Sequence, residues 1–172
     1  MKIKIDIKKI LKEWGPYILI IFLVFLFKEF LYAPILVQGS SMESNLQEND
    51  VMILDKVTYK MSDIKRNDIV VISYNGKYLV KRVIGLPGET LEVKNNLVFI
   101  NGQVIDEEYL DEDAYTENYK LLWKIPEDCY FVMGDHRLVS YDSRSLGCFS
   151  KEKILGKANL VIFPFNRIGT KK

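Results

Sequence analysis

The sequence predicts a mainly β, extracytoplasmic body that a single N-terminal transmembrane helix ties to a membrane. Two observations favour this fold class. A lysine-rich start precedes an unbroken apolar run from Ile18 to Phe27, and beyond Val37 the hydrophobic pattern changes from helical to short, strand-like runs. The 172 residues suffice for one compact domain with such an extension. With 48% hydrophobic and 27% charged residues, the composition excludes a disordered chain.

The N-terminal segment carries the features of a membrane anchor. Residues 1–15 contain an excess of lysine over acidic residues: Lys2, Lys4, Lys8, Lys9 and Lys12 against Asp6 and Glu13. Residues 16–37 supply the roughly 20 mostly apolar positions that a spanning helix needs, provided that Lys28 and Glu29 are accommodated near the outer interface. Trp14 and Tyr17 suit an interfacial aromatic belt. Because lysines favour the inner side of a membrane, we expect residues 1–15 to be cytoplasmic and residues 38–172 to lie outside the cell membrane.

Two other interpretations of this segment compete with the anchor. A cleaved secretory signal would share the basic start and the short apolar run, but Tyr32-Ala33-Pro34 is a poor substitute for an A-x-A-like exit. A buried core helix would not explain the lysines that precede it. We therefore expect an uncleaved, single-pass anchor.

The remaining chain reads as a series of short strands bounded by polar turns. Candidate strands are Val51–Leu54, Asp68–Ile72, Tyr78–Ile84, Cys129–Met133 and Ala158–Phe163. Residues 97–105 predict a hairpin, because Asn101-Gly102 suits a type I′ turn, in which both central residues have positive φ. The acidic, tyrosine-rich residues 106–128 are expected to form a solvated insertion.

The composition gives no sign of a bound cofactor or of a nucleic acid partner. Basic and acidic residues are nearly balanced, at 24 and 23, which gives no reason to expect nucleic acid. Cys129 and Cys148 match no metal-site spacing, and neither a P-loop nor a dinucleotide fingerprint is present, so no metal and no cofactor is expected. Both cysteines are expected to be small core hydrophobes, with a disulfide as the alternative.

Two residues could together perform nucleophilic catalysis. Ser41 follows Gly39-Ser40 directly beyond the anchor, where an exposed Oγ could reach a peptide bond just outside the bilayer. Lys81 lies in a strand and shares its face with Leu79 and Val83. Burial beside apolar neighbours lowers the pKa of a lysine, as a general base working near neutral pH requires. The residues alone favour the plainer interpretation of a loop serine and an edge-strand lysine.

Several blocks resemble the motif set of the bacterial serine–lysine family of type I signal peptidases. In order along the chain they are GSSMESNL (residues 39–46), NDIVV (67–71), YLVKRVIGLPGE (78–89), GDHRLVSYDSR (134–144) and LGKA (155–158). The lysine block and the GDHRLVSYDSR block, which we call the buttress block, are highly specific together. The serine block alone would not be specific for this family.

The resemblance implies a membrane-bound endopeptidase that removes signal peptides from exported preproteins. It implies a signal-peptidase-type β-rich catalytic domain with Ser41 as nucleophile and Lys81 as general base. The backbone N–H of Ser41 would hold the oxyanion, while the family's second, hydroxyl donor maps to Gly39. Supporting roles fall to four residues: Ser140 would orient Lys81, Asp142 and Arg144 would brace the loop as an ion pair, and Met42 would pack by the site. The substrate cleft would accept small side chains near the cut.

The chain departs from the family pattern at four positions. Ser44 and Asn45 replace a proline and a threonine, and His136 and Val139 replace asparagines. These changes bear on substrate range and efficiency. They suggest, as an alternative, a divergent relative that acts in pilus assembly on pilin subunits with little or no proteolysis. A hydrolase based on His136 is a weaker alternative, because this histidine stands in a turn where the family has asparagine.

Overall fold

The computed structural model describes the backbone of residues 7–171 and the side chains of residues 12–25, 31–59 and 61–171. The expectations for Lys2, Lys4, Lys8 and Lys9, and for the accommodation of Lys28 and Glu29, fall outside these described residues.

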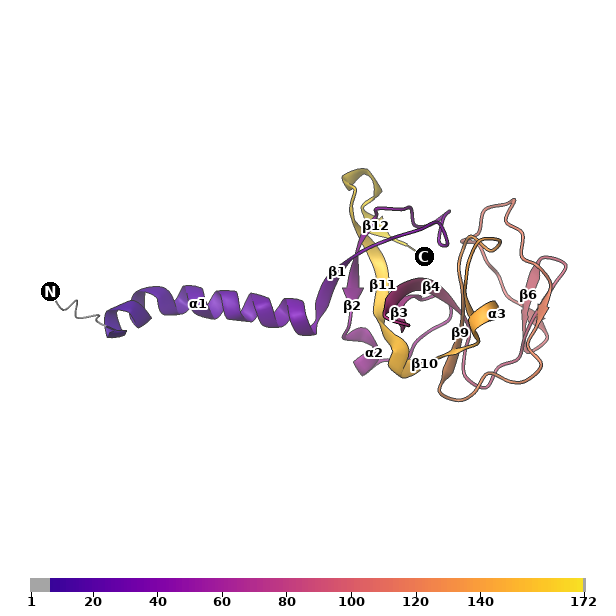
Figure 1. Ribbon diagram of the computed structural model, residues 1–172, viewed down its shortest axis with the longest axis horizontal. Helices are drawn as coiled ribbons and strands as arrows, with labels where there is room; N and C mark the ends of the chain where they lie inside the picture. Colours follow the sequence, from indigo (N-terminus) through magenta and orange to yellow (C-terminus); the bar gives the residue numbers. More distant parts are fainter. Residues whose placement is uncertain (1–6, 172) are drawn as a thin grey trace.

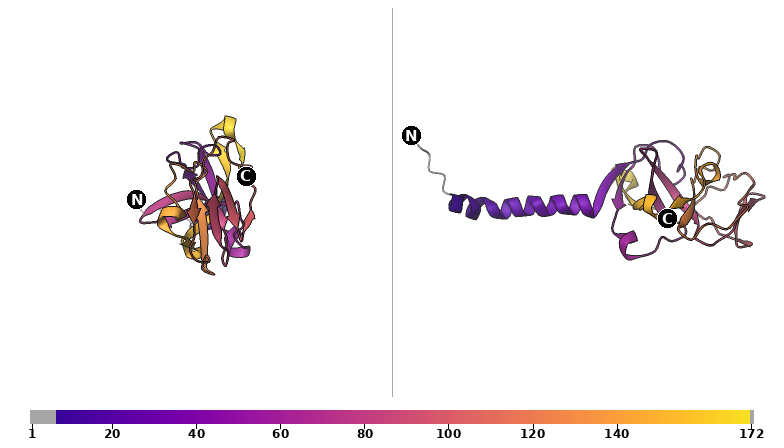
Figure 2. Two further views of the ribbon diagram at one scale, coloured as in Figure 1. Left: turned by 90° about the vertical axis from the view of Figure 1, so that its right-hand side faces the viewer. Right: turned by 60° about the horizontal axis from the view of Figure 1, so that its bottom comes forward.

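Helix α1 (Ile7–Phe30) projects from the β-rich body as a single rod (Figures 1 and 2). Its described large apolar side chains, from Trp14 to Phe25, each expose more than half of their surface, between 53% and 68%. Among the residues that the structure describes, no helix combines the length and hydropathy that crossing a bilayer requires. The body lies at the C-terminal end of α1.

The expected span of residues 16–37 is wrong at its C-terminal end. The helix stops at Phe30, and Tyr32–Leu36 forms strand β1, which pairs antiparallel with β2 (Val51–Asp55). Pro34 explains the change, since proline lacks the amide hydrogen that a helix interior uses, whereas it is tolerated on an edge strand. β1 is the edge strand of its sheet.

The larger sheet is antiparallel and eight-stranded, in the order β1-β2-β11-β3-β4-β9-β10, with β12 pairing β11. Its other strands are β3 (Ile69–Tyr74), β4 (Lys77–Gly85), β9 (Cys129–Met133), β10 (Phe149–Ser150), β11 (Ile154–Phe163) and β12 (Gly169–Thr170). The five strands expected from sequence are therefore present as β2, β3, β4, β9 and β11, within a few residues at each end.

A smaller, four-stranded sheet lies at the end of the body farther from α1 (Figure 1). It has the order β7-β6-β5-β8 and comprises β5 (Leu91–Lys94), β6 (Leu97–Ile100), β7 (Gln103–Val104) and β8 (Tyr119–Lys120). The hairpin expected at residues 97–105 is confirmed, with φ of 51° at Asn101 and 79° at Gly102.

The expectation of a solvated insertion at residues 106–128 is only partly right. The segment contributes β8 to the smaller sheet, and Thr116 and Ile125 are each 1% exposed. Ile125 belongs to the core cluster that the smaller sheet forms with β4 and β9. Apolar positions scattered among acidic ones gave no period by which the sequence could reveal this packing.

Short helical turns complete the body: α2 (Thr58–Met61), α3 (Ser143–Leu146), and the 3₁₀ turns η1 (Lys151–Lys153) and η2 (Phe165–Arg167). The core has three clusters. The first lies among β1, β2, β3 and β11 and includes Met42 and Leu46 from the loop after β1. This burial fixes the loop that carries Ser41.

Cys129 and Cys148 form a disulfide with a Cα–Cα distance of 5.6 Å, so the expectation of free core cysteines is wrong. The antiparallel pairing of β10 with β9 brings Cys148 next to Cys129. Both residues are half-buried and pack against the third cluster. Sequence spacing alone does not reveal such a neighbour, because the pairing of β9 with β10 is set by the fold.

Candidate active site

Ser41 and Lys81 meet in the structure although 40 residues separate them. The Nζ of Lys81 donates a hydrogen bond to the Oγ of Ser41 at 2.6 Å. Lys81 is 3% exposed, whereas Ser41 is partly exposed. A reachable hydroxyl thus contacts a buried amine, which is the arrangement that nucleophilic catalysis by a serine–lysine pair requires.

The loop after β1 positions Ser41 through its neighbours. Met42 and Leu46 are 2% and 0% exposed and anchor the loop in the first core cluster. The amide of Glu43 donates to the carbonyl of Ser40 at 3.0 Å, and that of Leu46 donates to the carbonyl of Met42 at 2.9 Å. Ser41 therefore lies in a hydrogen-bonded turn directly before a buried anchor residue.

Strand β4 positions Lys81. The strand pairs with β3 from Lys77 to Arg82, which places Lys81 opposite Val70, whereas β9 pairs only with the C-terminal part of β4, from Arg82 onward. Leu79 and Val83 pack with the second core cluster, as strand alternation predicts for the neighbours of Lys81.

Burial lowers the pKa of Lys81 from 10.5 to about 8, because desolvation disfavours the ammonium form. The carboxylates of Asp142 and Asp135 oppose this shift, and the guanidinium of Arg144 adds to it. With a pKa of about 8, roughly one amine in ten is neutral at pH 7. Lys81 can therefore accept a proton near neutral pH.

A groove of about 670 Å³ runs past this pair. One wall comes from residues 34–39 on and after β1, and the other from residues 77–81 of β4, with Ser41, Met42 and Val71 between them. Apolar side chains such as Ile35, Met42 and Leu79 line much of it. The hydroxyl of Ser41 and the amine of Lys81 thus belong to a concave, largely apolar surface.

The expected ion pair between Asp142 and Arg144 is present beside the site. The guanidinium of Arg144 donates from Nε and Nη2 to the two carboxylate oxygens of Asp142, at 2.9 and 2.8 Å. Asp142 is 0% exposed and also accepts from the amide of Gly134 at 3.0 Å. Burial by itself would raise the pKa of Asp142, but the bonds and charge of Arg144 outweigh it and hold that pKa below its ordinary value.

Ser140 does not make the hydrogen bond to Lys81 that the sequence predicts. Its hydroxyl is buried and lies beside the carboxylate of Asp142, whose pKa it helps to lower, rather than on the amine of Lys81. Ser140 instead packs where a side chain at Gly134 would have to lie: a β-carbon there would overlap both the Oγ of Ser140 and the carbonyl oxygen of Ser41. Gly134 therefore permits the buttress block to lie directly against the loop that carries Ser41.

A buried ion pair behind the site was not predicted from sequence. Arg82 and Asp135, both with fully buried side chains, form two hydrogen bonds, Nε to Oδ1 at 2.8 Å and Nη2 to Oδ2 at 2.6 Å. The guanidinium also lies 3.9 Å from the ring centroid of Tyr109. A signal was available, since alternation puts Arg82 on the face of β4 opposite to Lys81, where a buried arginine needs a carboxylate.

Comparison with known proteins decides the family. Residues 11–163 match the family described as signal peptidase, peptidase S26. The chain belongs to this family.

Relatives along the whole chain agree with this assignment. Signal peptidase I P of Bacillus subtilis subsp. natto is 45% identical, over 91% of both chains. Signal peptidase I of Bacillus amyloliquefaciens is 40% identical, over 97% of this chain and 96% of its own. A crystal structure of a signal peptidase I from Enterococcus faecalis V583 is similar at a TM-score of 0.51, with 32% identity over 56% of this chain and 97% of that chain. The mainly β body is thus a signal-peptidase fold.

Two departures from the signal peptidase pattern tie the nucleophile loop to the acidic segment. Ser44 has a φ of 92°, and its hydroxyl donates to a carboxylate oxygen of Asp111. Asn45 donates from Nδ2 to the carbonyl of Tyr109 at 2.7 Å and to the carboxylate of Asp135 at 2.9 Å. Side-chain hydrogen bonds therefore hold this loop at the two positions where the chain departs from the family pattern described above.

His136, the third departure, has its side chain beside Glu43. Its Nδ1 lies 3.4 Å from a carboxylate oxygen of Glu43, while its backbone amide donates to the carbonyl of Ser41 at 3.1 Å. This geometry suits a loop-bracing residue rather than the base of a triad. Val139, the fourth, is 54% exposed.

Proposed function

We propose that Ser41 and Lys81 are the catalytic pair with which this signal peptidase removes N-terminal signal peptides from exported preproteins. The observation that carries the proposal is the 2.6 Å contact between a partly exposed hydroxyl and a buried amine inside an apolar groove. The relatives are named for peptidase activity, and this contact favours proteolysis over a purely assembling role.

The proposed reaction follows from this contact. The Oγ of Ser41 attacks the carbonyl carbon of the scissile peptide while neutral Lys81 accepts the hydroxyl proton. The backbone N–H of Ser41 donates to the oxyanion; Gly39, in the position of the family's second donor, has no side chain to add a hydrogen bond. Lys81 then protonates the leaving amine, and later takes a proton from the water that hydrolyses the acyl-enzyme.

The groove indicates how the substrate would bind. Its two walls are the edge strand β1 with the residues that follow it, and the half of β4 that β9 leaves unpaired. An extended peptide could add to both as a further strand, with backbone hydrogen bonds supplying affinity. Alternate side chains would then point into the apolar floor beside Met42, which suits small apolar residues at the cut.

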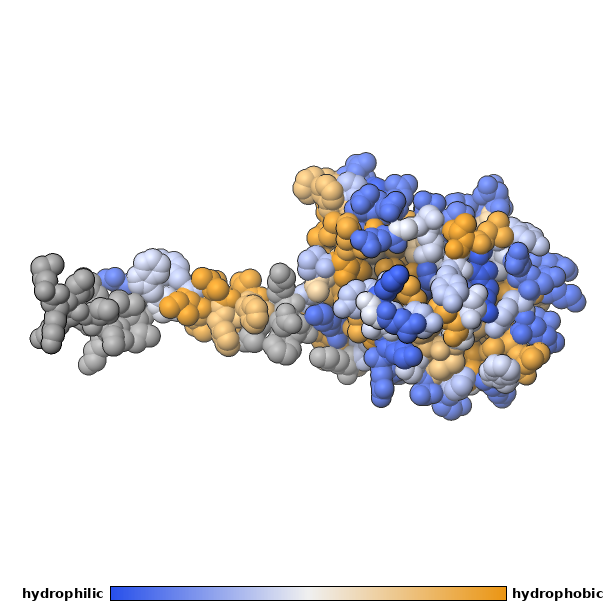
Figure 3. Space-filling model, in the orientation of Figure 1, coloured by the Kyte–Doolittle hydropathy of each residue, from blue (hydrophilic) through white to orange (hydrophobic). Residues whose placement is uncertain are grey.

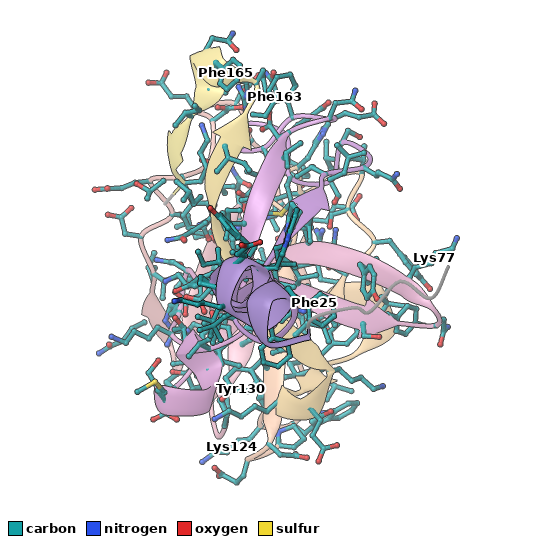
Figure 4. The ribbon with its side chains drawn as sticks, turned by 90° about the vertical axis from the view of Figure 1, so that its left-hand side faces the viewer. Phe25, Lys77, Lys124, Tyr130, Phe163 and Phe165 are labelled. Atoms are coloured by element: carbon teal, nitrogen blue, oxygen red, sulfur yellow. A yellow bond between two sulfur atoms is a disulfide. The ribbon has the colours of Figure 1, made fainter. Side chains whose placement is uncertain are left out.

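Members of this family are membrane-associated, and we propose a single-pass arrangement for this chain. Residues 1–15 would be cytoplasmic, the anchor would begin at Pro16 and would include the C-terminal part of α1, and residues 38–172 would form the extracytoplasmic catalytic domain. The exposed apolar side chains of the described part of α1, from Ile18 to Phe25, support this arrangement (Figure 3). Phe163 and Phe165 support it as well, because these large apolar side chains are 49% and 79% exposed. Both lie at the periphery of the body in the view along α1 (Figure 4).

The test is cleavage of a preprotein by the purified full chain in lipid vesicles. Ser41→Ala and Lys81→Ala are expected to abolish cleavage. Matched controls are Ser40→Ala, which removes the neighbouring hydroxyl, and Lys94→Ala, which removes an exposed lysine of β5 outside the groove; both should retain most of the rate. Cleavage by a correctly folded Ser41→Ala protein at the wild-type rate would reject the proposal. Loss of cleavage in His136→Ala, with cleavage retained in Lys81→Ala, would point to a different base.

A further inference from the structure

The disulfide closes the segment that forms one side of the active site. From Cys129 the chain runs along β9 to Gly134, turns through residues 134–141, and comes back through residues 142–148, which we call the return arm. This closed segment contains the whole buttress block. The two cysteines are at its base, at the opposite end of β9 from the site.

Few non-covalent bonds hold the return arm at this base. β10 pairs with β9 at only two positions, Phe149 with Tyr130 and Ser150 with Cys129. Within the arm, the hydroxyl of Ser143 accepts from the amide of Val132 at 2.9 Å. Gly147, directly before Cys148, has a φ of 77° and is exposed. The covalent bond therefore reinforces two stretches that are otherwise held by a short ladder, by the Ser143 and Lys151 hydrogen bonds and by the packing of Phe149 in the second core cluster.

At its other end the closed segment lies against the catalytic pair. Asp142 begins the return arm and accepts from the amide of Arg144 as the N-cap of α3. The carboxylates of Asp142 and Asp135 and the guanidinium of Arg144 are the charged groups that act on Lys81, and the amide of His136 donates to the carbonyl of Ser41 at 3.1 Å. Movement of the return arm would therefore move the charged groups that act on the amine of Lys81.

We propose that the Cys129–Cys148 disulfide is a positioning bond for the active site, which fastens the return arm to β9 and so holds the buttress block closed over Lys81. This inference rests on the proposed function of Ser41 and Lys81. It makes the activity sensitive to reduction. A dithiol supplies two electrons and two protons, the S–S bond breaks to give two cysteine thiols, and the dithiol becomes a cyclic disulfide. Both cysteines are half-buried, so that a small dithiol can approach.

Breaking the disulfide is expected to lower kcat, which reflects the chemical step, rather than to change KM, which reflects substrate binding. The groove walls come from β1, the residues after it and β4, none of which lies between Cys129 and Cys148. An opened segment would let water reach the amine of Lys81, and each unit by which its pKa then rises lowers the neutral fraction at pH 7 about tenfold. We expect kcat to fall by about tenfold at pH 7 while KM changes less than about twofold, with the midpoint of the pH–rate curve about one unit higher.

The experiment compares oxidised wild type, wild type reduced with dithiothreitol, and the double variant Cys129→Ser/Cys148→Ser, each as the full chain in vesicles with a preprotein substrate. Dithiothreitol added to the double variant is the matched control and should change nothing. Hydrogen exchange followed by mass spectrometry gives a readout that needs no catalysis. Amides of residues 134–147 should exchange faster once the bond is broken, while those of β2 and β3 keep their rates.

The outcomes separate this inference from the proposed function. If neither oxidised nor reduced wild type cleaves the preprotein, the proposed function fails, and the exchange data still report whether the disulfide holds the segment. If the pH–rate curves of oxidised wild type and the double variant coincide, the bond contributes only stability and the inference is overturned. Should the double variant fail to fold, freshly reduced wild type provides the same comparison.

Discussion

Replacing Lys81 with methionine is expected to make the protein more stable while it loses activity. Methionine has a similar length and no charge, so it can occupy the buried position next to Ser41 without desolvating an ammonium group. The direction of the expected stability change follows from the linkage between proton binding and folding. The pKa of Lys81 is lowered by burial from 10.5 to about 8, so between these values the unfolded chain holds a proton that the native protein has released.

The magnitude follows from that difference. Because each pKa unit corresponds to about 1.4 kcal/mol, the buried ammonium form costs roughly 3 kcal/mol of folding free energy at any pH below about 8. Lys81 is only 3% exposed, so solvent screening reduces this cost little. Loss of the hydrogen bond to Ser41 subtracts about 1 kcal/mol. The net expected gain for Lys81→Met is about 2 kcal/mol at pH 7; it should fall to about zero near pH 10 and become a small loss above pH 10.5, where only the missing hydrogen bond remains.

The assay is urea unfolding of wild type and Lys81→Met, as full chains in detergent, at pH 7 and at pH 10. A higher urea midpoint for the variant at pH 7, with a smaller difference at pH 10, is the expected result. Lys77→Met is the matched control, because Lys77 is an exposed lysine on the same strand and should show no pH-dependent gain. Equal stabilities of wild type and Lys81→Met at pH 7 would refute the argument that burial forces the amine toward its neutral form.

Three further predictions follow from the same structure. The single-turnover rate of preprotein cleavage should rise about tenfold per pH unit below a midpoint near 8; a rate already level at pH 6 would contradict the role of Lys81. Asp135→Ala leaves Arg82 buried without its carboxylate and should cost about 3–5 kcal/mol in urea unfolding, and a loss below 1 kcal/mol would speak against this pair as a structural element. Ser44→Pro, which restores the family residue, should lower the melting temperature and kcat because proline requires φ near −65° where Ser44 has 92°. Ser44→Gly is its control, and a stabilised Ser44→Pro protein would contradict the described loop.

The strands and the candidate pair Ser41–Lys81 were the parts that the sequence indicated, the strands through local patterns and the pair through the resemblance of its flanking blocks to a known family. β2, β3, β4 and β9 have β-branched residues in short runs, and the hairpin at residues 97–105 contains a dipeptide suited to its turn. Ser41 and Lys81 became candidates from their flanking residues. Their contact could not be derived from spacing, because it depends on how the loop after β1 packs beside β4.

The parts that sequence missed are non-local. β1 was assigned to the anchor because its apolar residues continue the helical run, and only pairing with β2 shows otherwise. The disulfide depends on the register between β9 and β10. The acidic segment looked solvated because its carboxylates dominate the composition, yet Glu107 forms an ion pair with buried Arg137. In each case the partner is distant in sequence.

Adjacent cations on β4 illustrate how the fold assigns opposite roles to similar side chains. Strand alternation sends Arg82 to Asp135, where two hydrogen bonds and a full opposite charge suit a guanidinium, which is always protonated. Lys81 points to the other face, and within the described part of the chain no carboxylate lies at ion-pair distance from its Nζ. The nearby carboxylate of Asp142 is already engaged by Arg144 and by the amide of Gly134. Lys81 therefore has the burial that disfavours its charged form without a paired carboxylate that would stabilise it, and this distribution of the carboxylates is what suits the amine to the proposed role of a base.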